Sequence, residues 1–149
     1  MNGHGREKPL VLIADDDEDI LELVRLRLTR CGYETVLARD GVAALAGIRS
    51  RRPDLVLLDV TMPGLDGYGV TAELRRDPET RTLPVILLTA LAQSTDVSRG
   101  FELGVDDYVT KPFSPQELEG RVASALARVD GRAQSVALLR PAAGGDLFA

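Results

Sequence analysis

Five short, nearly continuous apolar segments alternate with longer segments of helical periodicity, and this alternation limits the folds open to the chain. The apolar segments are residues 10–14, 35–38, 55–58, 85–88 and 105–109. Apart from the last, which contains Asp106 and Asp107, they do not alternate apolar with polar residues. Continuous apolarity is typical of strands covered on both faces, as in a parallel sheet between two layers of helices. The pattern therefore predicts an α/β domain with five parallel strands.

The segments between the apolar runs have the spacing and the start signals of helices. Apolar residues recur every four positions from Ile20 to Leu28, and Asp40 precedes a second apolar series as a candidate N-cap. The last series follows Ser114, and Glu117 three residues later completes a capping box. Right-handed crossovers between parallel strands bring the C-terminal ends of all strands to one edge of the sheet, where function is expected.

The length of the chain indicates one domain. At 149 residues, it has room for a single domain of typical size and a short appendage. We expect a flexible leader at residues 1–8, the domain at residues 9–130, and a tail or truncated linker at residues 131–149. In this last segment the periodicity is lost and Gly, Ala and Pro accumulate.

The composition argues against several partners and locations. Eighteen Lys and Arg against 23 Asp and Glu give a formal net charge of −5, which disfavours attraction to a phosphate backbone, so we expect no direct nucleic-acid partner. The chain has no apolar run long enough to span a membrane, its start lacks the apolar stretch of a signal peptide, and its single cysteine excludes an intramolecular disulfide. We therefore expect a cytoplasmic protein without a membrane partner.

Residues able to carry chemistry stand at the ends of the predicted strands. They are Asp15, Asp16, Asp59, Thr89 and Lys111. If the first and third strands are neighbours, the three aspartates converge within a few ångströms. Unit charges about 4 Å apart repel by roughly 4 kcal/mol at an effective dielectric near 20, so such a cluster needs protons or a cation. Carboxylate oxygens with room for water suit Mg²⁺.

These groups together provide the parts of a phosphoryl-transfer site. A carboxylate can be the nucleophile, and the product is then an aspartyl phosphate. The Lys111 ammonium is a fixed positive charge and the Thr89 hydroxyl is a donor on the same edge. Phosphoryl transfer is catalysed mostly by positioning and charge neutralisation, which this set of groups can supply with a divalent cation.

At these positions the sequence resembles the receiver domains of two-component response regulators. The matching motifs are Asp15-Asp16, Asp59 with Met62-Pro63-Gly64, Thr89-Ala90, Gly104-Val105-Asp106-Asp107-Tyr108 and Lys111-Pro112-Phe113. The resemblance extends from about residue 8 to residue 129. It implies a single flavodoxin-like (βα)5 doubly wound domain, with a five-stranded parallel sheet in the order 2-1-3-4-5.

The resemblance also implies a role for each residue of the site. Asp59 would take a phosphoryl group from a histidine kinase or a histidine phosphotransfer protein. Asp16, Asp59 and the backbone carbonyl of Thr61 would ligate Mg²⁺, with Asp15 acting mainly through water. Lys111 would contact the phosphate. The chain would not be an enzyme beyond catalysing its own phosphorylation and dephosphorylation.

Phosphorylation is expected to act as a switch. The added charge and acceptor oxygens can draw the Thr89 hydroxyl inward, and we hypothesise that Tyr108 fills the vacated space. A cis bond before Pro112 would position Lys111. The moving ring would reshape the surface of the fourth helix, fifth strand and fifth helix, where this family usually binds partners. The implied partners on that surface are an unidentified downstream protein and, after phosphorylation, a second copy of the chain.

Two alternative motifs fail on the residues. Asp15, Asp17 and Asp19 imitate the first ligands of an EF-hand loop, but Ile20 replaces the required glycine. Residues 67–72 fit a G-x-G-x-x-A dinucleotide pattern, yet they begin eight residues after Asp59 rather than directly after a strand. A turn leading into the third helix is the better interpretation of that segment.

Two other functions could use the same residues. An aspartyl-phosphate hydrolase of the haloacid dehalogenase type also places an aspartate nucleophile beside Mg²⁺ at a strand end. It needs a second aspartate two residues later, where this chain has Thr61. A pseudo-receiver would bind partners without phosphorylation, but the complete set of residues argues against it. The sequence therefore favours the phospho-accepting receiver.

Overall fold

The computed structural model describes residues 6–90 and 94–142, and in these residues five strands alternate with five helices. The strands are β1 (Leu10–Ala14), β2 (Glu34–Ala38), β3 (Leu55–Asp59), β4 (Val85–Thr89) and β5 (Asp107–Thr110). The helices are α1 (Glu18–Arg30), α2 (Gly41–Arg51), α3 (Gly67–Arg76), α4 (Ser94–Leu103) and α5 (Pro115–Ala142).

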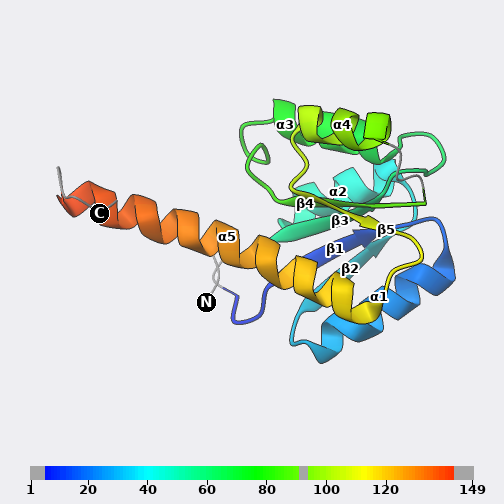
Figure 1. Ribbon diagram of the computed structural model, residues 1–149, viewed down its shortest axis with the longest axis horizontal. Helices are drawn as coiled ribbons and strands as arrows, with labels where there is room; N and C mark the ends of the chain where they lie inside the picture. Colours follow the sequence, from blue (N-terminus) through cyan, green and yellow to red (C-terminus); the bar gives the residue numbers. More distant parts are fainter. Residues whose placement is uncertain (1–5, 91–93, 143–149) are drawn as a thin grey trace.

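The strands form one parallel sheet in the order β2-β1-β3-β4-β5. This order confirms the predicted flavodoxin-like, doubly wound α/β fold. Figure 1 shows α2, α3 and α4 on one face of the sheet and α1 and α5 on the other. The central strands β1, β3 and β4 are buried at every residue, which explains why their sequences are continuously apolar.

The two faces of the sheet form separate hydrophobic clusters, because successive side chains of a strand point to opposite faces. On one face, Leu12 and Leu87 pack in a cluster with residues of α2 and α3. On the other face, Ile13 and Ile86 pack in a cluster with residues of α1 and α5. The sheet is therefore fixed from both sides, and the ends of its central strands have fixed positions.

Four helices begin with a side-chain cap. Asp17, Asp40 and Asp66 each accept a hydrogen bond from a backbone N–H in the first turn of α1, α2 and α3, at 2.9, 2.7 and 2.8 Å. The Ser114 hydroxyl accepts one from the N–H of Glu117 at 3.1 Å at the start of α5. The caps predicted at Asp40 and Ser114 are confirmed. They fix where each helix starts after the preceding strand, and so they fix the loops at this edge.

Two segments differ from their predicted structure. β5 begins at Asp107 rather than at residue 105, because the Asp106 carboxylate accepts the N–H of Val85 at 2.9 Å and pairs with Arg75 at 3.5 Å. Residues 67–72 form the first turns of α3 rather than a turn before it. The expected leader is described only from residue 6, and the expected tail only to residue 142.

The last helix is longer than its apolar periodicity predicts. Leu118, Val122 and Ala125 are buried in the cluster with α1. The helix continues to Ala142, past residue 130, and Figure 1 shows this part extending beyond the sheet. Despite the length of α5, no helix within residues 6–90 and 94–142 combines the length and apolarity that a bilayer crossing requires.

Candidate functional site

The C-terminal ends of the strands place the predicted site residues at one edge of the sheet. The N–H of Asp15 donates to the carbonyl of Ala38 at 3.1 Å, so the β1–β2 hydrogen bonding continues one residue past β1. The N–H of Lys111 donates to the carbonyl of Thr89 at 2.8 Å in the same way after β5. Asp59 is the last residue of β3. The main chain therefore fixes the point from which each of these side chains starts.

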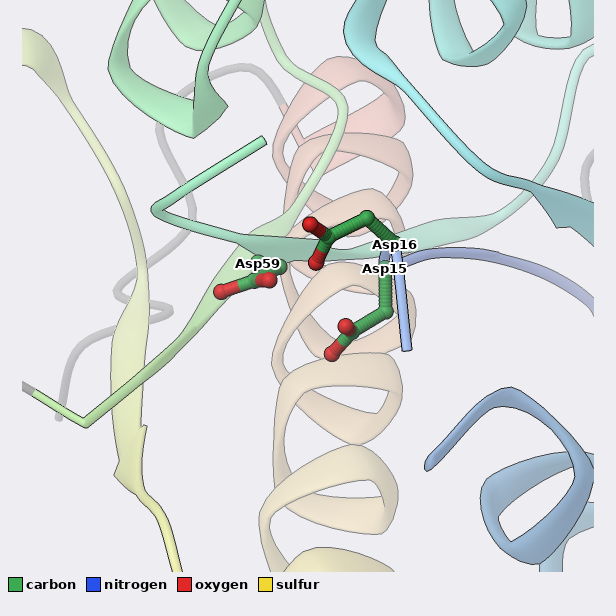
Figure 2. Close-up of side chains that lie close together, drawn as sticks. All are labelled: Asp15, Asp16 and Asp59. Carbon is green, nitrogen blue, oxygen red and sulfur yellow. The ribbon is translucent and has the colours of Figure 1, made fainter. Parts of the chain in front are cut away.

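The structure brings the three predicted aspartates together. Carboxylate oxygens of Asp15, Asp16 and Asp59 lie within 4.8 Å of one another. Figure 2 shows the three side chains projecting into a shared space at the ends of β1 and β3. Asp15 and Asp59 are buried, with 0% and 5% exposure, whereas Asp16 is exposed. The cluster is therefore buried on one side and open on the other.

The ammonium group of Lys111 lies between the two buried carboxylates. Its Nζ is 2.7 Å from Oδ2 of Asp15 and 3.4 Å from Oδ1 of Asp59. The other oxygen of Asp15 accepts the N–H of Asp17 at 2.9 Å. The peptide bond between Lys111 and Pro112 is cis. Asp15 thus has a partner for each oxygen, and Lys111 is closer to Asp15 than to Asp59.

The charge of the Asp59 carboxylate is only partly compensated by its neighbours. Burial, and next the charge of Asp15, raise the pKa of Asp59 to about 7, against the opposing effects of Lys111 and of the Thr61 N–H. Burial acts to lower the pKa of Lys111, but its hydrogen bond to Asp15 and the charges of Asp15 and Asp59 outweigh burial and raise it. A divalent cation would supply the missing positive charge, and a set of carboxylate oxygens suits Mg²⁺.

Thr89 and Tyr108 lie on the same face of neighbouring strands. Thr89 is buried at the end of β4, two residues after Leu87, and Leu87 pairs with Tyr108 across β4 and β5. The Tyr108 hydroxyl donates to the hydroxyl of Tyr68 at 3.4 Å, and its ring meets Phe101 edge-on with the ring centroids 5.5 Å apart. Nothing in the sequence spacing indicated that Tyr68 or Phe101 would contact Tyr108.

Sequence reasoning also missed two glycines beside the site. Gly41 and Gly67 are the first residues of α2 and α3, and both are buried. In the sequence, Gly67 stands out only as the first glycine of the G-x-G-x-x-A pattern. The available signal was an aspartate N-cap followed directly by glycine, in Asp40-Gly41 and in Asp66-Gly67.

Comparison with known proteins adds a family and close relatives. Residues 11–123 match the family model described as the response regulator receiver domain. The probable transcriptional regulator ycf27 of Galdieria sulphuraria is 50% identical over 125 residues, which cover 84% of this chain and 48% of the relative. The DNA-binding dual master transcriptional regulator RpaA of Synechocystis is 44% identical over 122 residues, covering 82% and 51%. The chain thus spans about half the length of these curated relatives.

Solved structures agree with this result. A putative response regulator from Chloroflexus aurantiacus is 42% identical with a TM-score of 0.78, covering 81% of this chain and 99% of that chain. The receiver domain of a sensor histidine kinase from Pseudomonas aeruginosa is 31% identical with a TM-score of 0.75, covering 80% and 98%. That structure contains a magnesium ion coordinated in the active site cleft.

The relatives correct one expectation from the sequence. The expected absence of a direct nucleic-acid partner is wrong, because the similar proteins are transcriptional regulators, and one of them is named as DNA-binding. The expectation was based on the net charge of −5. That charge belongs to a chain that matches only about half of these proteins, so it does not describe the surface with which a whole regulator contacts DNA.

Proposed function

The chain belongs to the response regulator receiver domain family of two-component signalling, and from this premise we propose that Asp59 accepts a phosphoryl group in a Mg²⁺-dependent reaction. The donor would be a histidine kinase or a histidine phosphotransfer protein. One observation carries the proposal: the Asp59 carboxylate is buried, lies within 4.8 Å of those of Asp15 and Asp16, and has the Lys111 ammonium 3.4 Å away. These are a nucleophile, a cation site and a fixed positive charge.

Asp16, Asp59 and the backbone carbonyl of Thr61 would hold Mg²⁺, with Asp15 acting mainly through water. When bound, the ion would neutralise charge on the carboxylates and on the incoming phosphoryl oxygens. The Thr61 N–H donates to Oδ1 of Asp59 at 3.2 Å, so the main chain at Thr61 lies beside the acceptor carboxylate. The position of the loop that follows β3 would therefore set the geometry of the cation site.

In the transfer, the P–N bond of a phosphohistidine breaks and a P–O bond to a carboxylate oxygen of Asp59 forms. The histidine nitrogen keeps the electron pair and then takes a proton from solvent. Asp59 attacks only when ionised, and positive charge nearby opposes the burial that raises its pKa to about 7. Lys111 would contact one phosphoryl oxygen, and the hydroxyl of Thr89 would donate to another.

The signal would be a rearrangement of Tyr108. Its ring contacts Phe101 of α4 and its hydroxyl meets that of Tyr68 of α3. If Thr89 moves toward the phosphoryl group, space beside the sheet becomes available on the face that Tyr108 shares. Movement of the ring would then change the surface formed by α4, β5 and α5.

An intact-mass measurement tests the acceptor. After incubation with Mg²⁺ and a small acyl phosphate, we expect one phosphoryl adduct, lost in Asp59→Asn and retained in the control Asp77→Asn, which lies after α3. No adduct on the wild-type chain would contradict the proposal and favour a pseudo-receiver. Rapid multiple turnover would favour the hydrolase, for which the family match gives no support.

The relatives suggest what the receiver controls. We infer that phosphorylation of this chain regulates DNA binding in a transcriptional regulator of the ycf27 and RpaA kind. The test is a chimaera in which this chain replaces the matching half of such a relative. In gel-shift assays, the acyl phosphate should change the affinity of the chimaera for DNA, and Asp59→Asn should remove that change. An affinity that does not respond would contradict the inference.

A further inference from the structure

The loop of residues 60–66, between β3 and α3, rests on two glycines. A Cβ atom added to Gly41, at the start of α2, would lie 2.1 Å from the carbonyl oxygen of Leu65. A Cβ atom added to Gly67, at the start of α3, would lie 2.5 Å from the carbonyl oxygen of Asp59, in the peptide bond that joins β3 to the loop. Both contacts are far shorter than real Cβ contacts. The loop backbone therefore lies against the two helix starts with no room for a side chain.

The loop is also anchored along its length. Val60 and Met62 are buried in the cluster with α2 and α3, and Leu65 packs against it. The N–H of Gly67 donates to the carbonyl of Val60 at 3.0 Å. A side chain at position 41 would collide with the carbonyl oxygen of Leu65. Because this oxygen belongs to the main chain, it cannot rotate out of the way as the end of a side chain can. Relief of the contact requires the loop or the start of α2 to move, and movement of the loop would carry the carbonyl of Thr61 with it.

We propose that Gly41 is a positioning residue for Mg²⁺, because its missing side chain lets the loop rest on α2 and so sets the place of the Thr61 carbonyl. This inference rests on the proposed function. Opening the contact from 2.1 Å to the 3.0 Å minimum requires a shift of about 0.9 Å. Mg²⁺ demands near-octahedral ligands at about 2.0–2.1 Å, whereas Ca²⁺ accepts irregular sets of oxygens at about 2.3–2.6 Å. Displacement of the loop should therefore harm Mg²⁺ binding more than Ca²⁺ binding.

The test measures the Kd of both ions for the wild-type chain, Gly41→Ala and the control Gly120→Ala. An added Cβ at Gly120 of α5 meets no atom within 4 Å. We expect the Kd for Mg²⁺ to rise at least tenfold in Gly41→Ala and the Kd for Ca²⁺ to rise less than threefold, with neither changed in Gly120→Ala. Circular dichroism in EDTA establishes that the variants are folded.

In a folded Gly41→Ala, a Kd for Mg²⁺ within twofold of wild type would overturn the proposal, and so would an equal loss for both ions. A wild-type chain that does not bind Mg²⁺ would instead overturn the proposed function.

A second measurement uses only the wild-type chain. In ¹⁵N-labelled protein, Mg²⁺ should shift the amide resonance of Thr61 and also that of Gly41, because the loop connects them, and should leave Gly120 unchanged. A Gly41 resonance that does not respond would overturn the proposal even if the Gly41→Ala variant does not fold.

Discussion

The edge of the sheet that carries the site has two halves, and they are built in different ways. In the acceptor half, Asp15 and Asp59 are buried at the ends of β1 and β3, and main-chain hydrogen bonds and close backbone contacts position them. In the aromatic half, Tyr108 of β5 is partly buried and contacts Tyr68 and Phe101 through side chains. Main-chain contacts thus position the carboxylates, whereas the residues proposed to transmit the signal contact one another only through side chains, which can rotate.

The two halves also differ in the interactions that determine how they respond to substitution. Burial, and next the like charge of Asp15, dominate the acceptor half and raise the pKa of Asp59. Ring contacts dominate the aromatic half, where the guanidinium of Arg99 lies 4.4 Å from the centroid of the Tyr68 ring and Phe101 is exposed. Variants in the acceptor half should therefore respond to pH and cations, and variants in the aromatic half should respond to neither.

The largest effect on stability is expected when the ammonium group of Lys111 is removed from the acceptor half. In Lys111→Met, Asp15 and Asp59 lose an ammonium at 2.7 and 3.4 Å. Because both carboxylates stay buried, we expect the free energy of unfolding to fall by about 3 kcal/mol at pH 8 without divalent cations. Urea denaturation measures this loss, and Mg²⁺ should restore part of it.

The matched control is Arg128→Met, which removes an exposed cation of α5 and should change the free energy of unfolding by less than about 0.5 kcal/mol. If Lys111→Met lost no more stability than Arg128→Met, the electrostatic account of the acceptor half would be wrong.

The second largest effect is a dependence of the free energy of unfolding on pH, caused by Asp59. Its pKa is about 7 in the folded protein without a cation, against 3.8 ordinarily. Between pH 3.8 and about 7, the folded state binds more protons than the unfolded chain. The stability that comes from a protonated Asp59 is therefore present at low pH and is lost as pH rises through about 7. Asp59→Asn cannot ionise, so it should be more stable than wild type at pH 8 and equal to it near pH 4. The full shift corresponds to about 1.4 kcal/mol per pKa unit, but the site is open to solvent on one side and screening reduces this, so we expect a difference of about 2 kcal/mol at pH 8.

Urea denaturation of wild type and Asp59→Asn from pH 4 to pH 8 measures this difference. A difference that stays constant over the range would show that Asp59 does not titrate as proposed.

The sequence predicted the acceptor half better than the aromatic half. Asp15, Asp59 and Lys111 each follow or end an apolar run, and a parallel sheet brings the C-terminal ends of its strands to one edge whatever the details of helix packing. The strand order, in contrast, was implied by the resemblance to receiver domains, because the alternation of elements predicts a parallel sheet but not the order of its strands. Residue types and the parallel sheet were sufficient to place these side chains at one edge.

The remaining features depend on tertiary packing that sequence spacing does not encode. Nothing in the spacing of Gly41 and Leu65 indicates that their backbones touch, because the contact arises only when α2 and α3 pack side by side. The pairing of Tyr68 with Tyr108 depends likewise on how α3 and α4 lie against β5. Predicting which residues gather at one edge of the sheet therefore does not identify the contacts that position them.

A smaller effect, and one without cation dependence, is expected in the aromatic half. A Cβ added to Gly100 of α4 would lie 1.7 Å from the Tyr108 hydroxyl oxygen, so Gly100→Ala should displace the ring. Because the far end of a side chain can move, we expect a loss of about 1 to 2 kcal/mol, whereas Gly120→Ala should gain about 0.5 kcal/mol from helix propensity. Urea denaturation and the aromatic NMR resonances of Tyr108 measure these effects.

Phosphorylation of Gly100→Ala by the acyl phosphate should differ less than about threefold from wild type, because the acceptor half is positioned independently of the ring. A much larger change in rate would show that the two halves are not separate.

The smallest effect is expected from the hydroxyl pair itself. Tyr68→Phe removes a hydrogen bond of 3.4 Å but keeps the ring beneath Arg99, so the free energy of unfolding should fall by about 0.5 kcal/mol. Tyr108→Phe removes the same bond, and a double-mutant cycle should therefore give a coupling energy of about 0.5 kcal/mol at any Mg²⁺ concentration. A coupling energy above about 2 kcal/mol would mean that the aromatic half is as firmly fixed as a buried charge pair. Tyr108 could not then rearrange at the small energetic cost that a phosphorylation switch on this face requires.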